Sequence, residues 1–176
     1  MKVEQLGGLP GDPPYPIQIA LPGASTFREG YVLSVHPSHG EAWIGNFQKG
    51  ICYYSSFHAL DDEHLVVVAG GQGYVVNVNS KACVHSFGGD VMLLLPVPQT
   101  STVLAISNID VELHCATLMV WRSKRIAWDG IGKVDFQSTE LCGQARHFDD
   151  TWHPFRLQIA TGEHTGGAYT DQHPSN

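Results

Sequence analysis

Residues 65–79 read LVVVAGGQGYVVNVN, and this stretch predicts the fold of the chain. It opens with a short apolar run rich in β-branched valine, which favours an extended strand. The GGQG that follows supplies glycines, which adopt the positive φ angles of a tight reversal at little cost. The return half alternates, so Tyr74, Val76 and Val78 are predicted to point one way and Val75, Asn77 and Asn79 the other. The stretch therefore predicts a β-hairpin with one face against a core.

The same signals recur along the rest of the sequence. Short runs of β-branched and aromatic residues are separated by turns rich in Gly, Pro, Asn and Asp, and no segment reads as an amphipathic helix. We expect an all-β fold, an antiparallel meander of short strands that forms a sandwich or a barrel. Besides the hairpin, strands are predicted at 17–21, 30–35, 41–47, 51–57, 82–87, 91–95, 102–106, 111–115, 118–128, 133–136, 140–145 and 155–159.

The two ends of the chain differ in composition from its middle. Residues 1–14 contain paired glycines and prolines, which disfavour helix and central strand, so we expect an extended N-terminal arm. That arm either frays or adds a strand to an exposed sheet edge. Residues 15–165 are expected to form a single all-β domain, and residues 166–176 a frayed C-terminal tail.

Two strand-like stretches share a pattern. Residues 74–81 and 155–162 both run from an aromatic residue through an alternating strand into a small polar turn. The second stretch resembles the outer blade strands of β-propeller repeat proteins, where an aliphatic strand ends at a Thr-Gly turn, and residues 103–114 resemble them too. No tryptophan–aspartate repeat signature recurs, so the resemblance is to propeller-like repeat strands and to no specific family. It implies a propeller-like arrangement, with about four blades in a chain of this length, as an alternative to the sandwich or barrel.

Charge and cysteine content restrict the partners and the compartment. The formal net charge of −7 opposes binding to nucleic acid and to anionic membranes, so we expect neither as a partner. The four cysteines are widely spaced and form no C-x-x-C pair, and each lies in or beside an apolar run, where a free thiol behaves as a small hydrophobe. The N-terminus lacks the apolar segment of a secretory signal. We therefore predict a reduced, cytoplasmic protein.

The ten histidines raise the hypothesis of a metal site. Residues 147–153 read HFDDTWH, followed by His164, and histidine and carboxylate are sound ligands for zinc, iron or manganese. The same stretch also reads as a polar loop whose two aspartates form turns. His36 and His39 would be close across a turn, but they need a carboxylate from elsewhere to complete a site. The spacing of these residues in the sequence does not bring their side chains together at one point. We therefore predict no metal ligands and no cofactor.

Motifs for nucleophilic catalysis and for phosphate binding are missing from the sequence. There is no G-x-S-x-G elbow, and the GGQG lacks the Lys-[Ser/Thr] and the helix of a phosphate loop. His114 and Cys115 are adjacent, so on a strand their side chains point to opposite faces and cannot pair. The catalytic residues, if any exist, are not identified by the sequence.

Aromatic residues supply the remaining functional signal. The chain has more of them than a core of this size needs, and a sheet that leaves some on an open face would bind a protein partner or a small apolar ligand. We expect a non-catalytic binding module, either monomeric or a homo-oligomer, and the alternative is a metal-dependent cupin-like or lipocalin-like barrel enzyme that uses a His/Asp site. The candidate ligand-binding residues are Trp43, Tyr54, Trp121 and Trp128.

Overall fold

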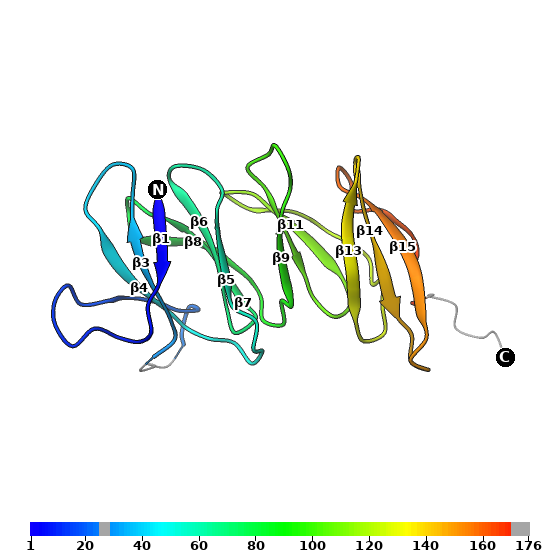
Figure 1. Cartoon of the computed structure of the whole chain (residues 1–176), viewed down its shortest axis with the longest axis horizontal. Helices are drawn as coiled ribbons and strands as arrows, with labels where there is room; N and C mark the ends of the chain where they lie inside the picture. The colour runs from blue at the N-terminus through cyan, green and yellow to red at the C-terminus, as the bar shows by residue number, and fades with distance from the viewer. Residues whose placement is uncertain (25–28, 170–176) are drawn as a thin grey trace.

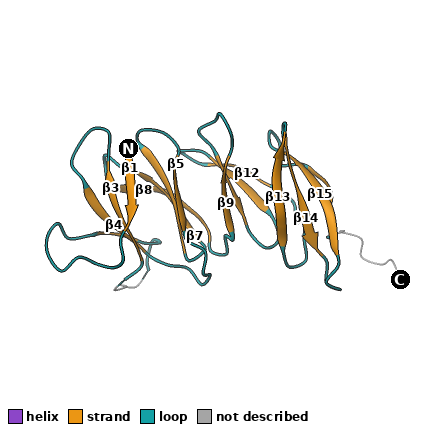
Figure 2. Ribbon diagram, in the orientation of Figure 1, coloured by secondary structure: helices purple, strands orange, loops and turns teal. Residues whose placement is uncertain are grey.

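The computed structural model describes residues 1–24 and 29–169, and these form sixteen strands in four four-stranded sheets with no helix (Figures 1 and 2). Sheet 1 has the order β1-β3-β4-β2, with β1 (Lys2–Gln5), β2 (Ile17–Ile19), β3 (Tyr31–His36) and β4 (Trp43–Phe47). Sheet 2 is the meander of β5 (Ser56–Ala59), β6 (His64–Ala69), β7 (Gln72–Asn77) and β8 (Ala82–Gly88). Sheet 3 is the meander of β9 (Leu93–Pro96), β10 (Val103–Ile106), β11 (Val111–His114) and β12 (Met119–Arg122). Sheet 4 is the meander of β13 (Ile131–Gln137), β14 (Glu140–Arg146), β15 (Trp152–Gln158) and β16 (His164–Gly166).

The four sheets follow one another in chain order and pack face to face, so that sheets 1 and 4 lie at opposite ends of the array (Figure 1). Three apolar clusters fill the spaces between consecutive sheets. The expected all-β, largely antiparallel meander is therefore confirmed, with the face-to-face packing of a sandwich repeated along the chain. Each sheet is open, and none of them closes into a barrel.

The opening hairpin forms as predicted, but both of its faces are buried. Residues 65–69 of β6 pair with β7 in antiparallel register, and Leu65 lies opposite Val76. Val76 packs into the cluster shared with sheet 1, whereas Val75 packs into the cluster shared with sheet 3. The predicted outward face of Val75 is therefore wrong, because sheet 2 lies between two other sheets. A strand covered on both faces also explains why β6 is an unbroken apolar run.

Sheet 4 alternates because only one of its faces is covered. In β15, Phe155 and Leu157 are buried against sheet 3, while Arg156 and Gln158 are exposed. A polar outer face on the last sheet is the device by which stacked-sheet and repeat proteins end an apolar core. The two stretches that share a sequence pattern, residues 74–81 and 155–162, contain most of β7 and β15, and each of these is the third strand of a meander.

The N-terminal segment contributes to sheet 1. Lys2–Gln5 pairs antiparallel with β3, and Val3 packs against the first apolar cluster. β2 pairs parallel with β4 and is the exception to an otherwise antiparallel structure. At the other end, Gly166 is the last residue of β16, and residues 170–176 of the expected tail lie outside the described residues.

Two predicted strands are shorter than expected. β5 begins only at Ser56, so residues 48–55 are a loop, and β12 ends at Arg122, so residues 123–130 are a second loop. The four cysteines are free thiols. Cys83 is exposed on the edge strand β8 and the other three are half-buried, so none is fully enclosed in a core as the apolar neighbours had predicted.

Candidate functional site

The loops that follow β4, β6, β8, β10, β12 and β14 gather at one end of the array, the lower end in Figure 1. We call residues 48–55, 70–71, 89–92, 107–110, 123–130 and 147–151 the loop rim. Backbone hydrogen bonds link some of its neighbouring loops, such as those from Gly89 N to Gly71 O (3.0 Å) and from Gly130 N to Asn108 O (2.8 Å). Several large apolar side chains of the rim are exposed to solvent, namely Ile51, Tyr53, Met92, Trp128 and Phe148. The rim therefore presents several large apolar side chains to solvent.

An aromatic cluster occupies the part of the loop rim beside sheet 4. Trp128 and Phe148 are 40% and 72% exposed, and their ring centroids lie 5.9 Å apart in an edge-to-face arrangement. Tyr169 makes a second edge-to-face contact with Trp128, and the centroids of these two rings lie 5.2 Å apart. We call Trp128, Phe148 and Tyr169 the aromatic cluster.

Arg125 holds the aromatic cluster in place. Its guanidinium lies 5.1 Å from the ring centroid of Trp128 and 4.6 Å from that of Tyr169, within the range of a cation–π contact. The same group donates hydrogen bonds to the carbonyl oxygens of Ala127 (2.9 Å) and Trp128 (2.8 Å). The rings are thus fixed by contacts within the protein while their outer surfaces remain open to solvent.

The four aromatic residues named from the sequence do not line a common cavity. Trp43 is 3% exposed and belongs to the cluster between sheets 1 and 2. Tyr54 is half-buried and its hydroxyl accepts a hydrogen bond from Leu94 N at 3.0 Å. Trp121 is half-buried and its Nε1 donates to Ile159 O at 3.0 Å, so of the four only Trp128 presents an exposed ring on the loop rim.

Phe148 and Tyr169 were missed by the sequence reasoning. Phe148 stands in the polar loop 147–151, between a histidine and two turn-forming aspartates. A large apolar residue in that position has no strand that could bury it, which is a signal available in the sequence. Tyr169 has no such signal, because its contact with Trp128 joins segments that are far apart in the chain.

The histidine-rich loop 147–153 is a hydrogen-bonded turn centred on Asp149. Asp149 Oδ1 accepts hydrogen bonds from Thr151 Oγ1 (2.6 Å) and Thr151 N (3.1 Å), and it lies 3.0 Å from His147 Nδ1. These hydrogen bonds, those from Thr151 first, hold the pKa of Asp149 well below its usual range. His153 completes the turn through a 2.9 Å contact with Thr151 Oγ1.

A metal site is not formed by these histidines as the structure places them. Within residues 1–24 and 29–169, no group of three or more His, Cys, Asp or Glu side chains is arranged to hold a metal ion. His36 and His39 are both exposed, and His36 contacts the hydroxyl of Ser34 at 3.0 Å. His164 lies apart from the 147–153 loop, in the groove beside β16.

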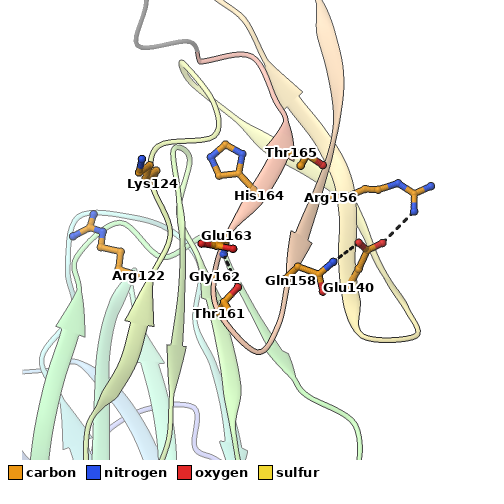
Figure 3. A pocket seen from close by; sticks show the side chains of 10 residues that line it. All are labelled: Arg122, Lys124, Glu140, Arg156, Gln158, Thr161, Gly162, Glu163, His164 and Thr165. Atoms are coloured by element: carbon orange, nitrogen blue, oxygen red, sulfur yellow. Dashed lines mark hydrogen bonds and ion pairs between the residues drawn. The ribbon is translucent and has the colours of Figure 1, made fainter.

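A groove of about 550 Å³ runs between the edge strand β12 and the turn from β15 to β16 (Figure 3). Its cations are engaged within the protein: Arg156 binds Glu140 at 3.1 Å, and Arg122 binds Asp110 at 2.6 Å. Lys124 and Glu163 add one further charge of each sign. The groove is consequently polar and electrically balanced, which does not suit a small apolar ligand or a strong anion site.

A chain of polar side chains crosses from sheet 2 to sheet 3. His85 Nε2 lies 3.4 Å from His114 Nδ1, and His114 Nε2 lies 2.9 Å from Glu112 Oε2. Glu112 contacts Arg122 at 3.5 Å, so the chain reaches the groove. The His114 ring is fully buried and stacks on Phe87 at 3.9 Å between centroids.

Burial and hydrogen bonds shift the pKa values of three side chains in this chain of contacts. Burial, with a smaller contribution from His114, lowers the pKa of His85. The hydrogen bond from His114 lowers the pKa of Glu112, and the hydrogen bond with Asp110 raises the pKa of Arg122. A histidine pair next to a carboxylate and an arginine is an arrangement that joins two sheets, since His85 and His114 meet across the interface and Glu112 and Arg122 continue the contacts along sheet 3.

Comparison with known proteins adds no relative to this description. No protein-family model matches the chain, and no curated protein matches it in sequence. The described part of the chain also has no helix long and apolar enough to cross a membrane. Any functional conclusion about this chain therefore rests on its own geometry.

Proposed function

We propose that the protein is a non-catalytic binding module that recognises a protein partner through the aromatic cluster of the loop rim. The observation that carries this proposal is the exposure of Trp128 and Phe148, at 40% and 72%, on rings that are already held in place. Tryptophan and tyrosine are enriched among the residues that dominate protein–protein binding, because they offer large contact areas for few rotatable bonds. The contact with Arg125 further lowers the conformational entropy that Trp128 and Tyr169 would lose on binding.

A protein partner fits the described surface better than a small apolar ligand does. Small ligands are held in concave, mostly apolar cavities. Each of five cavities on the described residues has charged side chains in its lining, including the 450 Å³ hollow beside the aromatic cluster, which His147, Asp149 and His153 line. A set of exposed rings bordered by polar residues is instead the arrangement of a protein interface.

A reducing, cytoplasmic location belongs to the same proposal. All four cysteines are free, and the half-buried ones lie on different sheets or loops with no disulfide between them. The net charge of −7 supports a protein partner over nucleic acid or an anionic membrane.

Peptide selection with a matched set of variants tests the proposal. A library of displayed random peptides is selected on the full chain, and the affinities of the selected peptides are measured by fluorescence anisotropy. Phe148→Ser removes the most exposed ring of the cluster and should weaken binding at least tenfold, whereas Leu118→Ser, at a half-exposed apolar position outside the loop rim, should leave it unchanged. Equal binding to both variants, or peptides that bind without altering Trp128 fluorescence, would show that the aromatic cluster is not the recognition surface.

A further inference from the structure

The loop from β4 to β5 carries the two most exposed large apolar side chains of the described residues. The side chains of Ile51 and Tyr53 are essentially fully exposed to solvent, at 94% and 104%. Cys52 between them points back into the protein and is half-buried. The loop joins sheets 1 and 2 at the lower end of the array in Figure 1. Neither side chain is buried against residues 1–24 or 29–169, so the pair adds nothing to the packing of the described part of the chain.

Backbone hydrogen bonds hold this loop against the turn between β6 and β7. Gly50 N donates to Ala69 O, and Cys52 N donates to Gly70 O, both at 2.9 Å. In return, Gly71 N donates to Tyr54 O at 2.9 Å. The loop is therefore tied at residues 50, 52 and 54, and the alternating residues 51 and 53 are the ones that face solvent.

Glycine at the turn permits this contact. A Cβ atom at Gly71 would lie 2.8 Å from Cys52 Cβ, and one at Gly50 would lie 2.6 Å from Gly70 O. Both distances are shorter than side-chain atoms adopt, so the loop approaches the turn as closely as only glycine allows. The glycine-rich stretch of the hairpin thus serves as the base on which residues 50–54 rest.

We propose that Ile51 and Tyr53 are a paired anchor that inserts into an apolar pocket on a partner protein. Exposed apolar side chains on a backbone that is already fixed bind with a small loss of conformational entropy. Tyrosine suits this role because its ring fills an apolar pocket while its hydroxyl reaches polar groups at the pocket floor or edge. The partner is accordingly a protein with a concave apolar site deep enough for a tyrosine ring beside a smaller aliphatic side chain.

The surroundings favour a different protein over a second copy of this chain or a bilayer. Five cavities on the described residues have charged side chains in their linings, and none of these five offers a purely apolar pocket to Tyr53 of a second copy. The net charge of −7 opposes approach to an anionic bilayer. The anchor lies beside sheets 1 and 2 and the aromatic cluster beside sheets 3 and 4, so either surface can act without the other.

Photo-crosslinking followed by binary affinity measurements tests the paired anchor. The photoreactive residue p-benzoylphenylalanine is placed at position 53 of the full chain, and at position 118 as a control, and both proteins are irradiated in an extract of cells that express the protein. A protein captured from position 53 and not from position 118 is then purified, and its affinity for the wild type and for variants is measured by calorimetry. The variants are Tyr53→Ser, Ile51→Ser, Tyr53→Phe, Phe148→Ser and Leu118→Ser.

We expect Tyr53→Ser to weaken binding about 30-fold, the size of an interface hot spot, and Tyr53→Phe and Leu118→Ser to change it less than threefold. The anchor is refuted if position 53 captures no protein beyond the control, or if the captured protein binds Tyr53→Ser as tightly as the wild type. It is also refuted if Tyr53→Ser abolishes sedimentation with phosphatidylcholine vesicles, because the surface would then be a membrane contact. The Phe148→Ser variant reports separately on the aromatic cluster, so failure of one surface is distinguishable from failure of the other.

Discussion

Truncating Val75 to alanine should destabilise the protein as much as truncating Val76 does. Both side chains are fully buried, Val76 against sheet 1 and Val75 against sheet 3. Each change removes two methyl groups, which costs about 1.6 kcal/mol of transfer free energy. The residual cavity raises the loss of unfolding free energy to about 2–3 kcal/mol.

Equilibrium unfolding in urea measures this loss for the two variants and for Val84→Ala as a control. Val84 is 43% exposed on the edge strand β8, so its truncation should cost less than about 0.5 kcal/mol. If sheet 2 had one open face, Val75→Ala would behave as Val84→Ala does. A cost for Val75→Ala below about 0.5 kcal/mol, with Val76→Ala still costly, would therefore refute the burial of both faces.

Three further changes test the contact between residues 50–54 and the β6–β7 turn, the ion pair between Arg122 and Asp110, and the half-buried His85. Gly71→Ala should lower the unfolding free energy by more than about 1 kcal/mol in urea melts, because residue 71 has φ +85° and a Cβ there would meet Cys52. Arg122→Ala should cost about 1–3 kcal/mol by the same measurement, because it leaves the buried Asp110 carboxylate without its cation. Burial lowers the pKa of His85, so the stability that its neutral form provides is present above pH of about 6.5 and is lost as the pH falls through its lowered pKa. His85→Gln should therefore flatten the fall of the urea midpoint between pH 7.5 and 5.

Each of these changes has a matched control in the chain. Gly11→Ala, at a site with no atom within 4 Å of the added Cβ, should be nearly neutral. Arg156→Ala breaks an exposed pair with Glu140 and should cost less than about 1 kcal/mol. His36→Gln replaces an exposed histidine on β3 and is the control for His85→Gln. If a change and its control altered the unfolding free energy or its pH dependence equally, the role given to Gly71, Arg122 or His85 would be contradicted.

Local sequence patterns were sufficient for the fold class. The β-branched run at 65–69, the glycines after it and the alternation in residues 155–159 depend only on backbone conformation and on side-chain period, and the structure forms strands at these places. The polar loop at 147–151 follows from the same local chemistry, since Asp149 accepts a hydrogen bond from the backbone N–H of Thr151, two residues further on.

Which faces are buried was decided by the stacking of the sheets. Val75 and Arg156 each lie in the third strand of a meander, yet Val75 is buried and Arg156 exposed, because sheet 2 has neighbours on both sides and sheet 4 on one. The alternation of side chains along a strand indicates which residues share a face. Whether that face is buried depends on the sheet that lies against it, and that sheet is formed by residues far away in the sequence.

The candidate surfaces depend on tertiary contacts in the same way. Trp43 and Trp128 are equivalent by residue type, and only the packing of sheet 1 on sheet 2 makes one a core residue while the other remains at the loop rim. The glycines at 70 and 71 predicted a turn from the sequence, since a reversal needs their positive φ angles. The tertiary structure alone decided that these glycines also contact the loop carrying Ile51 and Tyr53. This close approach joins two segments that no local pattern connects.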